Sequence, residues 1–471
     1  MKTVIVDPLT RISGLLRIEV DIEDNKVKDA RVTGNQFRGF ERMFQDRPPF
    51  DIIRLAPRIC GICSTHHALV ATLAIEDSMK VIPDFNGKLV RDITNAFEFL
   101  QNEIRHIYFF VMPDYVKMIS INPVFKTSDN KDNDYRLTDI QTKIINEHYL
   151  EAIKYSREAH KAIAVLSGKA PHCHGIWVGG TTTKIDIQQF EEVKYIISGI
   201  KDFVINKLIP DVQLISKVYS DYFSIGRGHG NLMSFGLFNE YESPIKYSIP
   251  KVMINNVESN LNIGNISESI KSTWVVSKNE NLIPGVNPPA MGFAYKEGAY
   301  SWINSPRYLG YPIEVGALAR MTLAGKYKNG ISVMDRIVAK SLEAKNICEI
   351  IEELISLLKL EDAEQKIWQE PVNADGVGIY EAERGSLGHW ISIKNSKVSN
   401  YTVITPSAWN LSPMDGNGVK GTVEQALIGT TIKNNLAPVE IGRIVRSFDP
   451  CSNCAAHVIS DKYKTIDIKI L

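Results

Sequence analysis

Two segments decide how this chain folds and what it holds: RICGICSTHH at residues 58–67 and DPCSNCAAH at residues 449–457. Each contains a Cys-x-x-Cys pair, a spacing that turns two thiolates toward one point. The pairs use four of only six cysteines, namely Cys60, Cys63, Cys451 and Cys454. Four sulfur ligands favour a soft transition metal. The sequence therefore predicts a fold that brings both ends of the chain together around a metal site.

Each pair also has a simpler interpretation. A lone pair suits half of a structural zinc site or a redox dithiol, and two pairs together usually bind structural zinc. Zinc ribbons keep their pairs close, whereas these pairs stand at opposite ends of the chain. Closing so long a loop costs on the order of 5 kcal/mol, which a structural zinc ion, at roughly 10–16 kcal/mol, would offset. The spacing nevertheless favours a catalytic site assembled deep between distant segments, because a small zinc knuckle gains nothing from it.

Composition excludes several classes of protein. The 471 residues include 54 basic and 54 acidic side chains, a balance that gives no basic footprint for nucleic acid. Six cysteines in a chain of this length do not make a disulfide framework. The longest strongly apolar stretch, residues 68–75, is too short to span a bilayer, and the N-terminus lacks the apolar core of a signal peptide. We therefore expect no signal or transmembrane segment.

The spacing of apolar residues predicts a mostly helical body. Apolar side chains that recur every three or four residues predict helices over residues 68–79, 89–111, 142–166, 187–209 and 333–358. Short strands and turns are expected over residues 1–57, 225–310 and 371–450, and a further strand at 464–471. No stretch is a convincing linker. The expected fold class is thus mainly α with small peripheral β-sheets (α+β), in a single domain over residues 1–471.

The residues around the cysteines extend both pairs into longer signatures. The first reads Arg-x-Cys-Gly-x-Cys-x-x-x-His and the second Asp-Pro-Cys-x-x-Cys-x-x-His. Four more blocks accompany them: DPLTR at residues 7–11, RGFE at 38–41, RGSLGHW at 384–390 and TPSAWN at 405–410. In these motifs, and in their order, the chain resembles the large subunit of nickel-iron hydrogenases over nearly its whole length. The resemblance implies the helical large-subunit body of that family.

The resemblance also implies a role for each cysteine. Cys60 and Cys451 match terminal nickel ligands, while Cys63 and Cys454 match the thiolates that bridge nickel to iron. The iron of this family carries cyanide and carbon monoxide ligands. Thiolates suit this task because they are soft, electron-rich ligands for a metal that changes redox state.

Residues outside the cysteine pairs match groups that surround this centre. Arg384 matches an arginine above the open nickel position, and Asp449 a carboxylate that pairs near it. Ser407 matches a hydrogen-bond donor to cyanide, with Pro406 packed beside it. His67 follows Cys63 by one helical turn and could bond a sulfur. A surface ion pair is the simpler interpretation of Arg384.

A second metal is implied beside the first. Glu41 and His457 match ligands of a magnesium site, and a solvated turn carboxylate is the simpler alternative for Glu41. Cys348 lies on an apolar helix face and is expected to pack in the core. Cys173 lies within PHCHG, which resembles a metal-binding tripeptide, but the resemblance places this turn near the partner interface. GRGHG at residues 226–230 lacks the lysine and the context of a phosphate loop.

The chain departs from the family pattern at three positions. Ser13 stands where a glutamate is the expected proton relay next to a terminal cysteine, and a hydroxyl holds no transferable charge near neutral pH. Glu383 replaces the proline that usually precedes Arg384, and Asn102 replaces an aspartate. These changes put the usual proton route in doubt, with a water chain or Glu383 as its replacement.

The resulting functional hypothesis is an enzyme that cleaves H2 reversibly into protons and electrons. A hydrogen sensor of the same fold is the alternative; a non-catalytic relative, which would lack the cysteines, and a zinc protein are less favoured. Sensors typically end at the last motif histidine, whereas this chain continues through residues 458–471, like a peptide removed on maturation. The expected partners are an iron–sulfur small subunit, a maturation endopeptidase and nickel-insertion chaperones. We expect a location in the cytoplasm or at a membrane through the partner subunit.

Overall fold

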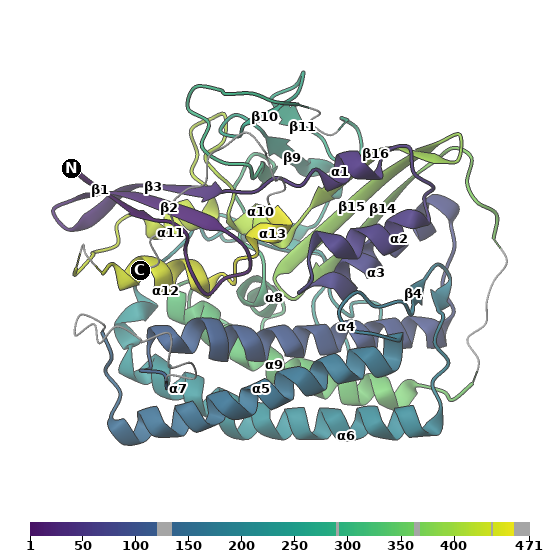
Figure 1. Cartoon of the computed structure of the whole chain (residues 1–471), viewed down its shortest axis with the longest axis horizontal. Coiled ribbons are helices and arrows are strands. Elements are labelled where there is room, and N and C mark those ends of the chain that lie inside the picture. The colour runs from purple at the N-terminus through teal and green to yellow at the C-terminus, as the bar shows by residue number, and fades with distance from the viewer. Residues whose placement is uncertain (120–133, 289–291, 362–367, 435–436, 456–471) are drawn as a thin grey trace.

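The computed structural model describes residues 1–119, 134–288, 292–361, 368–434 and 437–455. Long helices form a layer at the bottom of Figure 1, and small sheets and short helices lie above it. The predicted class, mainly α with small peripheral sheets, is confirmed. The strand expected at residues 464–471 lies outside the described residues.

The helical layer agrees with the periodicity of the sequence. It consists of α4 (Phe85–Arg105), α5 (Asp139–Ser167), α6 (Ile187–Phe203), α7 (Ile209–Val218) and α9 (Val333–Leu357). Side-chain caps set where several of these helices begin: the Asp84 carboxylate accepts from the third residue of α4, and Ser332 and Asp335 form a capping box on α9. Gly168, in a left-handed conformation, ends α5.

One predicted helix end was wrong, and a second helix changes its type before it reaches its predicted end. The helix expected to stop before Pro210 passes through a π-helical turn, Val204–Leu208, into α7. Pro210 sits in the first turn of α7, where its missing N–H costs little. The helix expected to reach residue 111 becomes π-helical at His106–Val111. Such turns insert a residue without ending the helix, so apolar spacing alone does not reveal them.

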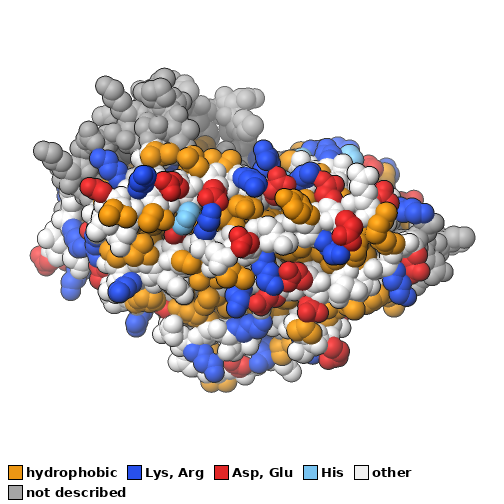
Figure 2. Space-filling model, turned by 90° about the horizontal axis from the view of Figure 1, so that it is seen from below, with side chains coloured by type: hydrophobic (Ala, Val, Ile, Leu, Met, Phe, Trp, Pro, Cys, Tyr) orange, Lys and Arg blue, Asp and Glu red, His pale blue; other side chains and the backbone are white. Residues whose placement is uncertain are grey.

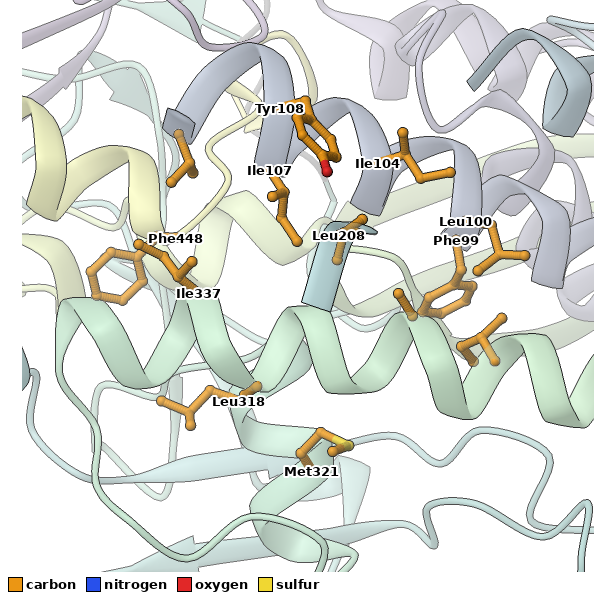
Figure 3. Close-up of a cluster of buried hydrophobic side chains, with 14 of the residues drawn as sticks. Phe99, Leu100, Ile104, Ile107, Tyr108, Leu208, Leu318, Met321, Ile337 and Phe448 are labelled. Carbon is orange, nitrogen blue, oxygen red and sulfur yellow. The ribbon is translucent and has the colours of Figure 1, made fainter. Parts of the chain in front are cut away.

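The core joins the helices to one another. Phe99 of α4 and Ile107 of the following π-helical turn point toward α9 (Figure 3), which contributes Ile337 and other buried side chains. On the far side of α9, Leu318 and Met321 belong to the short helix α8 (Ala317–Leu323). These contacts fix α4 and α9 against each other. Both helices also carry polar residues that face the site described below.

Six small sheets complete the molecule within the described residues. Three-stranded sheets are β1 (Lys2–Val6), β2 (Leu16–Glu23) and β3 (Lys26–Gly34); β6 (Leu232–Ser234), β7 (Lys251–Ile254) and β8 (Val257–Asn260); β9 (Ile266–Ser269), β11 (Asn281–Leu282) and β13 (Ser305–Tyr308); and β14 (Ala374–Ala382), β15 (Gly385–Lys394) and β16 (Lys397–Ile404). The two-stranded ones are β4 (Ile176–Trp177) with β5 (Gly180–Thr181), and β10 (Val275–Val276) with β12 (Gly292–Phe293). All named strand pairs are antiparallel.

Short helices supplement the strands expected in the irregular segments. They are α1 (Phe40–Phe44), α2 (Asp51–Leu55), α10 (Pro406–Asn410), α11 (Thr422–Leu427), α12 (Val439–Ser447) and α13 (Ser452–Ala455). The expectation of strands and turns alone over residues 1–57 and 371–450 was therefore incomplete. Except for α12, with nine residues, these helices have one or two turns and bury too few residues to establish a 3.6-residue pattern.

Helix α3 (Ser64–Met79) begins immediately after Cys63 and lies on the β14–β16 sheet. Two glycines of β14 permit this close approach. A Cβ atom at Gly376 would stand 2.1 Å from the Ala74 carbonyl oxygen, and one at Gly378 would stand 2.1 Å from that of Val70. Larger side chains would push α3 off the sheet, and with it the first cysteine loop.

A two-residue turn joins β14 to β15. Ala382 pairs with Gly385, so the turn consists of Glu383 and Arg384. Gly385 has φ of 129°, and a Cβ there would stand 2.5 Å from a methyl group of Val315. The hairpin thus presents two charged, buried side chains next to each other.

The surface agrees with the balanced composition. Figure 2 shows the face below the helical layer, where basic and acidic side chains alternate without a continuous field of one sign. Among the described residues, every helix is too short or too polar to cross a membrane.

Candidate metal centre

The two cysteine loops meet at the junction of the helical layer and the sheets. The first loop follows a short 3₁₀ helix (Ala56–Ile59) and leads from Cys60 to the start of α3. The second leaves α12, passes Asp449 in a left-handed conformation with φ of 51°, and enters α13. As predicted, the fold brings Cys60 and Cys451 together although 391 positions separate them.

Hydrogen bonds from two side chains and from the backbone of Ser13 hold the loops in place. Arg38 donates to the carbonyl oxygens of Ile59 and Asn453, one on each loop. Ser13 pairs with the second loop through its backbone: its N–H donates to Pro450 at 3.2 Å, and its carbonyl accepts from residue 452 at 2.8 Å. The Ser407 hydroxyl accepts from the Cys451 N–H at 2.9 Å.

The four thiols form one compact, buried group. Cys60 Sγ lies 3.5 Å from Cys451 Sγ, and Cys63 Sγ lies 3.3 Å from Cys454 Sγ. The Cys451 and Cys454 sulfurs are 2.8 Å apart. All four ligand atoms lie within 4.8 Å of one another, and all four cysteines are free of disulfides. Each cysteine of the first loop thus contacts one cysteine of the second, while the shortest distance joins the two sulfurs of the second loop.

The protonation of these thiols fits a metal. Hydrogen bonds from the three neighbouring cysteines lower the pKa of Cys451 well below its ordinary value. The same crowding raises the pKa of Cys63, and burial raises that of Cys454. These opposite shifts favour a thiolate at Cys451 and thiols at Cys63 and Cys454. A bound metal removes this conflict because it ionises its thiol ligands.

Arg384 lies over this group as one of several buried polar side chains. Its guanidinium donates to Asn102 Oδ1 at 2.6 Å and to the Asp449 carbonyl at 3.0 Å. Glu383 pairs with it at 2.5 Å. The Asp449 carboxylate lies 3.2 Å from the Arg384 Nε and 2.5 Å from the Lys340 Nζ on α9.

These contacts determine the charge of the group. Burial alone raises the pKa of Asp449, but Arg384 and Lys340 outweigh it and hold the pKa well below its ordinary value. Asp449 is therefore a carboxylate. A cavity of about 20 Å³, lined by Lys340, Glu383, Arg384 and Asp449 among others, lies beside it. That volume accommodates about one water molecule.

A second buried cluster links the first cysteine loop to Arg384. The Glu98 carboxylate of α4 accepts from the first N–H groups of α3, and lies 2.6 Å from His66 Nδ1. His66 Nδ1 also lies 3.2 Å from Glu383. Burial lowers the pKa of His66, but Glu383 and Glu98 outweigh it and raise the pKa to about 9. His66 is therefore an imidazolium between two carboxylates at neutral pH.

His67 behaves differently from its neighbour. Its Nδ1 lies 3.1 Å from His389 Nε2, and His389 in turn lies 2.8 Å from the Tyr401 hydroxyl. Burial lowers the pKa of His67 to about 4, so the ring is neutral. Its buried Nε2 has no hydrogen-bond partner among the described residues. That atom is left for a group the protein would bind.

Glu41 lines a separate cavity of about 60 Å³, together with Glu268, Asn304 and Cys454. One Glu41 oxygen accepts from the Val403 N–H at 2.7 Å. Burial raises the pKa of Glu41 to about 7. Burial, with a contribution from Glu41, raises the pKa of Glu268 to about 8. Two carboxylates that repel each other in this way suit a divalent cation. His457, the expected companion ligand, lies outside the described residues.

The structure gathers most of the sequence-predicted residues within one region. The four cysteines form the thiol group. Around it lie Arg384, Asp449, Ser407 and Pro406. Glu41 lines a cavity that Cys454 also lines. Cys348 is buried on α9 within the core, as expected. Burial raises the pKa of Cys173 to about 12, so it is a poor metal ligand.

Sequence reasoning missed Arg38, Glu98, Lys340 and Glu268 as parts of the site. Lys340 carried a usable signal, because it shares the apolar face of its helix with Ile337 and Ala344. Glu98 likewise interrupts an apolar run. Arg38 lies in an irregular segment and Glu268 in the four-residue strand β9, which is too short for its period to indicate which side chains point inward.

Comparison with known proteins gives a consistent result. The family model described as nickel-dependent hydrogenase matches residues 38–132 and 122–457. The chain is 31% identical to the periplasmic [NiFeSe] hydrogenase large subunit of Desulfomicrobium baculatum, covering 96% of this chain and 94% of that protein. It is 28% identical to the hydrogenase-2 large chain of Escherichia coli K12, covering 99% of both.

Solved structures agree with the sequence comparison. The H2-activated [NiFeSe] hydrogenase of Dm. baculatum matches with a TM-score of 0.92 at 31% identity, over 97% of this chain and 100% of that one. The reduced Ni-Fe-Se hydrogenase of D. vulgaris Hildenborough matches with a TM-score of 0.91 at 32% identity, over the same shares.

Proposed function

This chain belongs to the family of nickel-dependent hydrogenases, and from that premise we propose a role for each residue of the site. It is the catalytic large subunit of a nickel-iron hydrogenase, an oxidoreductase that cleaves H2 reversibly into protons and electrons. When bound, the nickel–iron centre supplies the soft, redox-active metals at which H2 is split. The relatives named above are hydrogenase large subunits, and none of those names describes a sensor.

One observation carries the assignment of the ligands: four buried thiols from both ends of the chain lie within 4.8 Å of one another. We propose that Cys60 and Cys451 bind nickel alone and that Cys63 and Cys454 bridge it to iron. The cross-loop pairs Cys60–Cys451 and Cys63–Cys454 support this division. Cyanide and carbon monoxide would complete the iron coordination.

Several neighbouring side chains would orient and balance this centre. The Arg384 guanidinium, which contacts Asp449, would supply a fixed positive charge beside the bound metals. The Ser407 hydroxyl already accepts from Cys451, so its own hydrogen is free to donate to a cyanide. Pro406 packs beside it at the start of α10. The unpartnered Nε2 of His67 suits a thiolate or another acceptor at the metals.

We propose magnesium for the cavity that contains Glu41. The raised pKa values of Glu41 and Glu268 support a cation there, since it would restore both carboxylates to their charged form. His457 is the expected further ligand. This second metal would hold the end of the chain beside Cys454, which lines the same cavity.

Electrons leave this chain through a small subunit. Beyond the four ligands only Cys173 and Cys348 remain, too few for an iron–sulfur cluster, so we propose that the partner carries the clusters. Nickel-insertion chaperones would load the site, and an endopeptidase would then remove residues 458–471 from an otherwise single domain. Any attachment to a membrane would run through the partner; one relative is named a quinone-reactive Ni/Fe-hydrogenase large chain, in Wolinella succinogenes.

The ligand assignment is tested by replacing one cysteine of each loop. Cys60→Ser and Cys451→Ser should abolish H2-dependent dye reduction and lower the nickel content of the purified complex. Cys348→Ser is the matched control, because this buried cysteine lies on α9 away from the metal group. Wild-type activity in either ligand variant overturns the assignment.

A further inference from the structure

The partners of Arg384 differ in the charge that they offer it. Asn102 accepts from the guanidinium at 2.6 Å but is neutral. Asp449 is charged, yet its carboxylate bonds Lys340 at 2.5 Å and is only 3.2 Å from Arg384 Nε. Glu383 lies 2.5 Å from Arg384 and has no second cation as close. Asp449 and Glu383 therefore balance the charge of the guanidinium together, and of the two only Glu383 is not also paired with Lys340.

Without Glu383 this region would carry an excess of positive charge. Arg105 donates to the same Asn102 oxygen at 2.7 Å, so the neutral amide stands between two guanidinium groups. Arg384 and Lys340 are each 4% exposed, and Asp449 alone would then face all three cations. Leaving a charge buried and unpaired is strongly unfavourable.

The Glu383 carboxylate also connects Arg384 to the first cysteine loop. Its other oxygen lies 3.2 Å from His66 Nδ1, which lies 2.6 Å from Glu98. Glu98 accepts from the N–H groups that open α3, directly after Cys63. A continuous chain of buried ion pairs thus runs from Arg384 to the segment that carries a metal ligand.

We propose that Glu383 is the residue that positions Arg384, and that it supplies from the hairpin turn the negative charge that position 102 on α4 lacks. The turn consists of Glu383 and Arg384 alone, so their pairing is fixed by the register of β14 and β15. Glu383 is a positioning residue, because both of its oxygens face cations and it acts on the metal site through Arg384 and the His66–Glu98 pair rather than by touching it. This inference rests on the role proposed above for Arg384.

The proposal predicts that positions 383 and 102 can exchange their charge. Glu383→Gln should lower turnover by about 10- to 100-fold and lower the thermal midpoint of the assembled complex. Asn102→Asp alone should also lower both, since its carboxylate would stand where Asn102 now donates to Asp449 at 2.6 Å. Asn102→Asp in the Glu383→Gln background should instead raise both above the single Glu383→Gln variant.

Glu381→Gln is the matched control. Glu381 is a buried carboxylate on the same hairpin, but it pairs with Arg320. Asn102→Asp should not rescue it. The solvent isotope effect on turnover should stay at its wild-type value in Glu383→Gln, whereas a proton carrier at this position would raise it.

Three results separate the possibilities. The proposal is overturned if Asn102→Asp raises neither the midpoint nor the turnover of the Glu383→Gln variant. It is also overturned if Glu383→Gln raises the solvent isotope effect. If Glu383→Gln does not assemble, the yield of metal-loaded complex replaces the midpoint, and equal yields for single and double variants overturn it. If the midpoint falls in Glu383→Gln and recovers in the double variant while turnover stays at the wild-type value throughout, Glu383 still positions Arg384. In that case the catalytic role proposed for Arg384 fails instead.

Discussion

Replacement of His66 tests the buried ion-pair chain through the pH dependence of stability. Glu383 and Glu98 raise the pKa of His66 from 6.5 to about 9. A folded-state pKa above the unfolded one contributes stability that is fully present below about pH 6.5 and is lost as pH rises through 9. A shift of this size corresponds to about 3 kcal/mol. His66→Gln should therefore destabilise the protein near pH 6, and the difference from wild type should shrink by pH 10.

Thermal unfolding of the assembled complex measures this effect. A chain of this length unfolds with an entropy of about 1 kcal/mol/K, so the expected difference at pH 6 is about 3 °C. His174→Gln is the control: this exposed imidazole has no carboxylate partner among the described residues, and burial lowers its pKa. A His66→Gln difference that stays constant from pH 6 to 10, or grows with pH, refutes the reasoning.

Three further outcomes are expected. The metal-loaded large chain alone should not reduce dyes with H2, because its electrons leave through the small subunit; turnover as fast as that of the complex would contradict this. Intact-mass measurement of active enzyme should show cleavage between His457 and Val458, and full-length mass with full activity would disprove it. Ser13→Ala should lower turnover by less than about tenfold, short of the roughly 10²–10⁴-fold loss of a general acid or base. The Ser13 hydroxyl lies 3.5 Å from Cys451 Sγ, so a larger loss would show that it does carry protons.

The sequence allowed the long helices and the thiol group to be predicted for physical reasons. Apolar periodicity over many turns specifies helices such as α5, and the capping residues Ser332 and Asp335 mark where α9 begins. Cysteines have few roles, so two spaced pairs leave few interpretations. Charged residues have many roles. Nothing local distinguishes Lys340, buried against Asp449, from a solvated lysine except the apolar face on which it lies.

The hairpin turn shows where sequence reasoning reaches its limit. Glu383 was considered as a replacement proton carrier, because a carboxylate next to Arg384 could serve that purpose. The structure instead surrounds it with cations: Arg384 on one oxygen and His66 on the other. That arrangement depends on where α3 and α4 place His66 and Glu98, which is a property of tertiary packing rather than of the local sequence.

Metal analysis combined with infrared spectroscopy of the purified complex tests the central claim most directly. The complex should contain stoichiometric nickel, held by the four buried thiols from both ends of the chain, and should show absorption bands from cyanide and carbon monoxide on the iron. Both signals should disappear in Cys451→Ser. Stoichiometric zinc in the wild-type protein, without nickel and without those bands, would contradict the account.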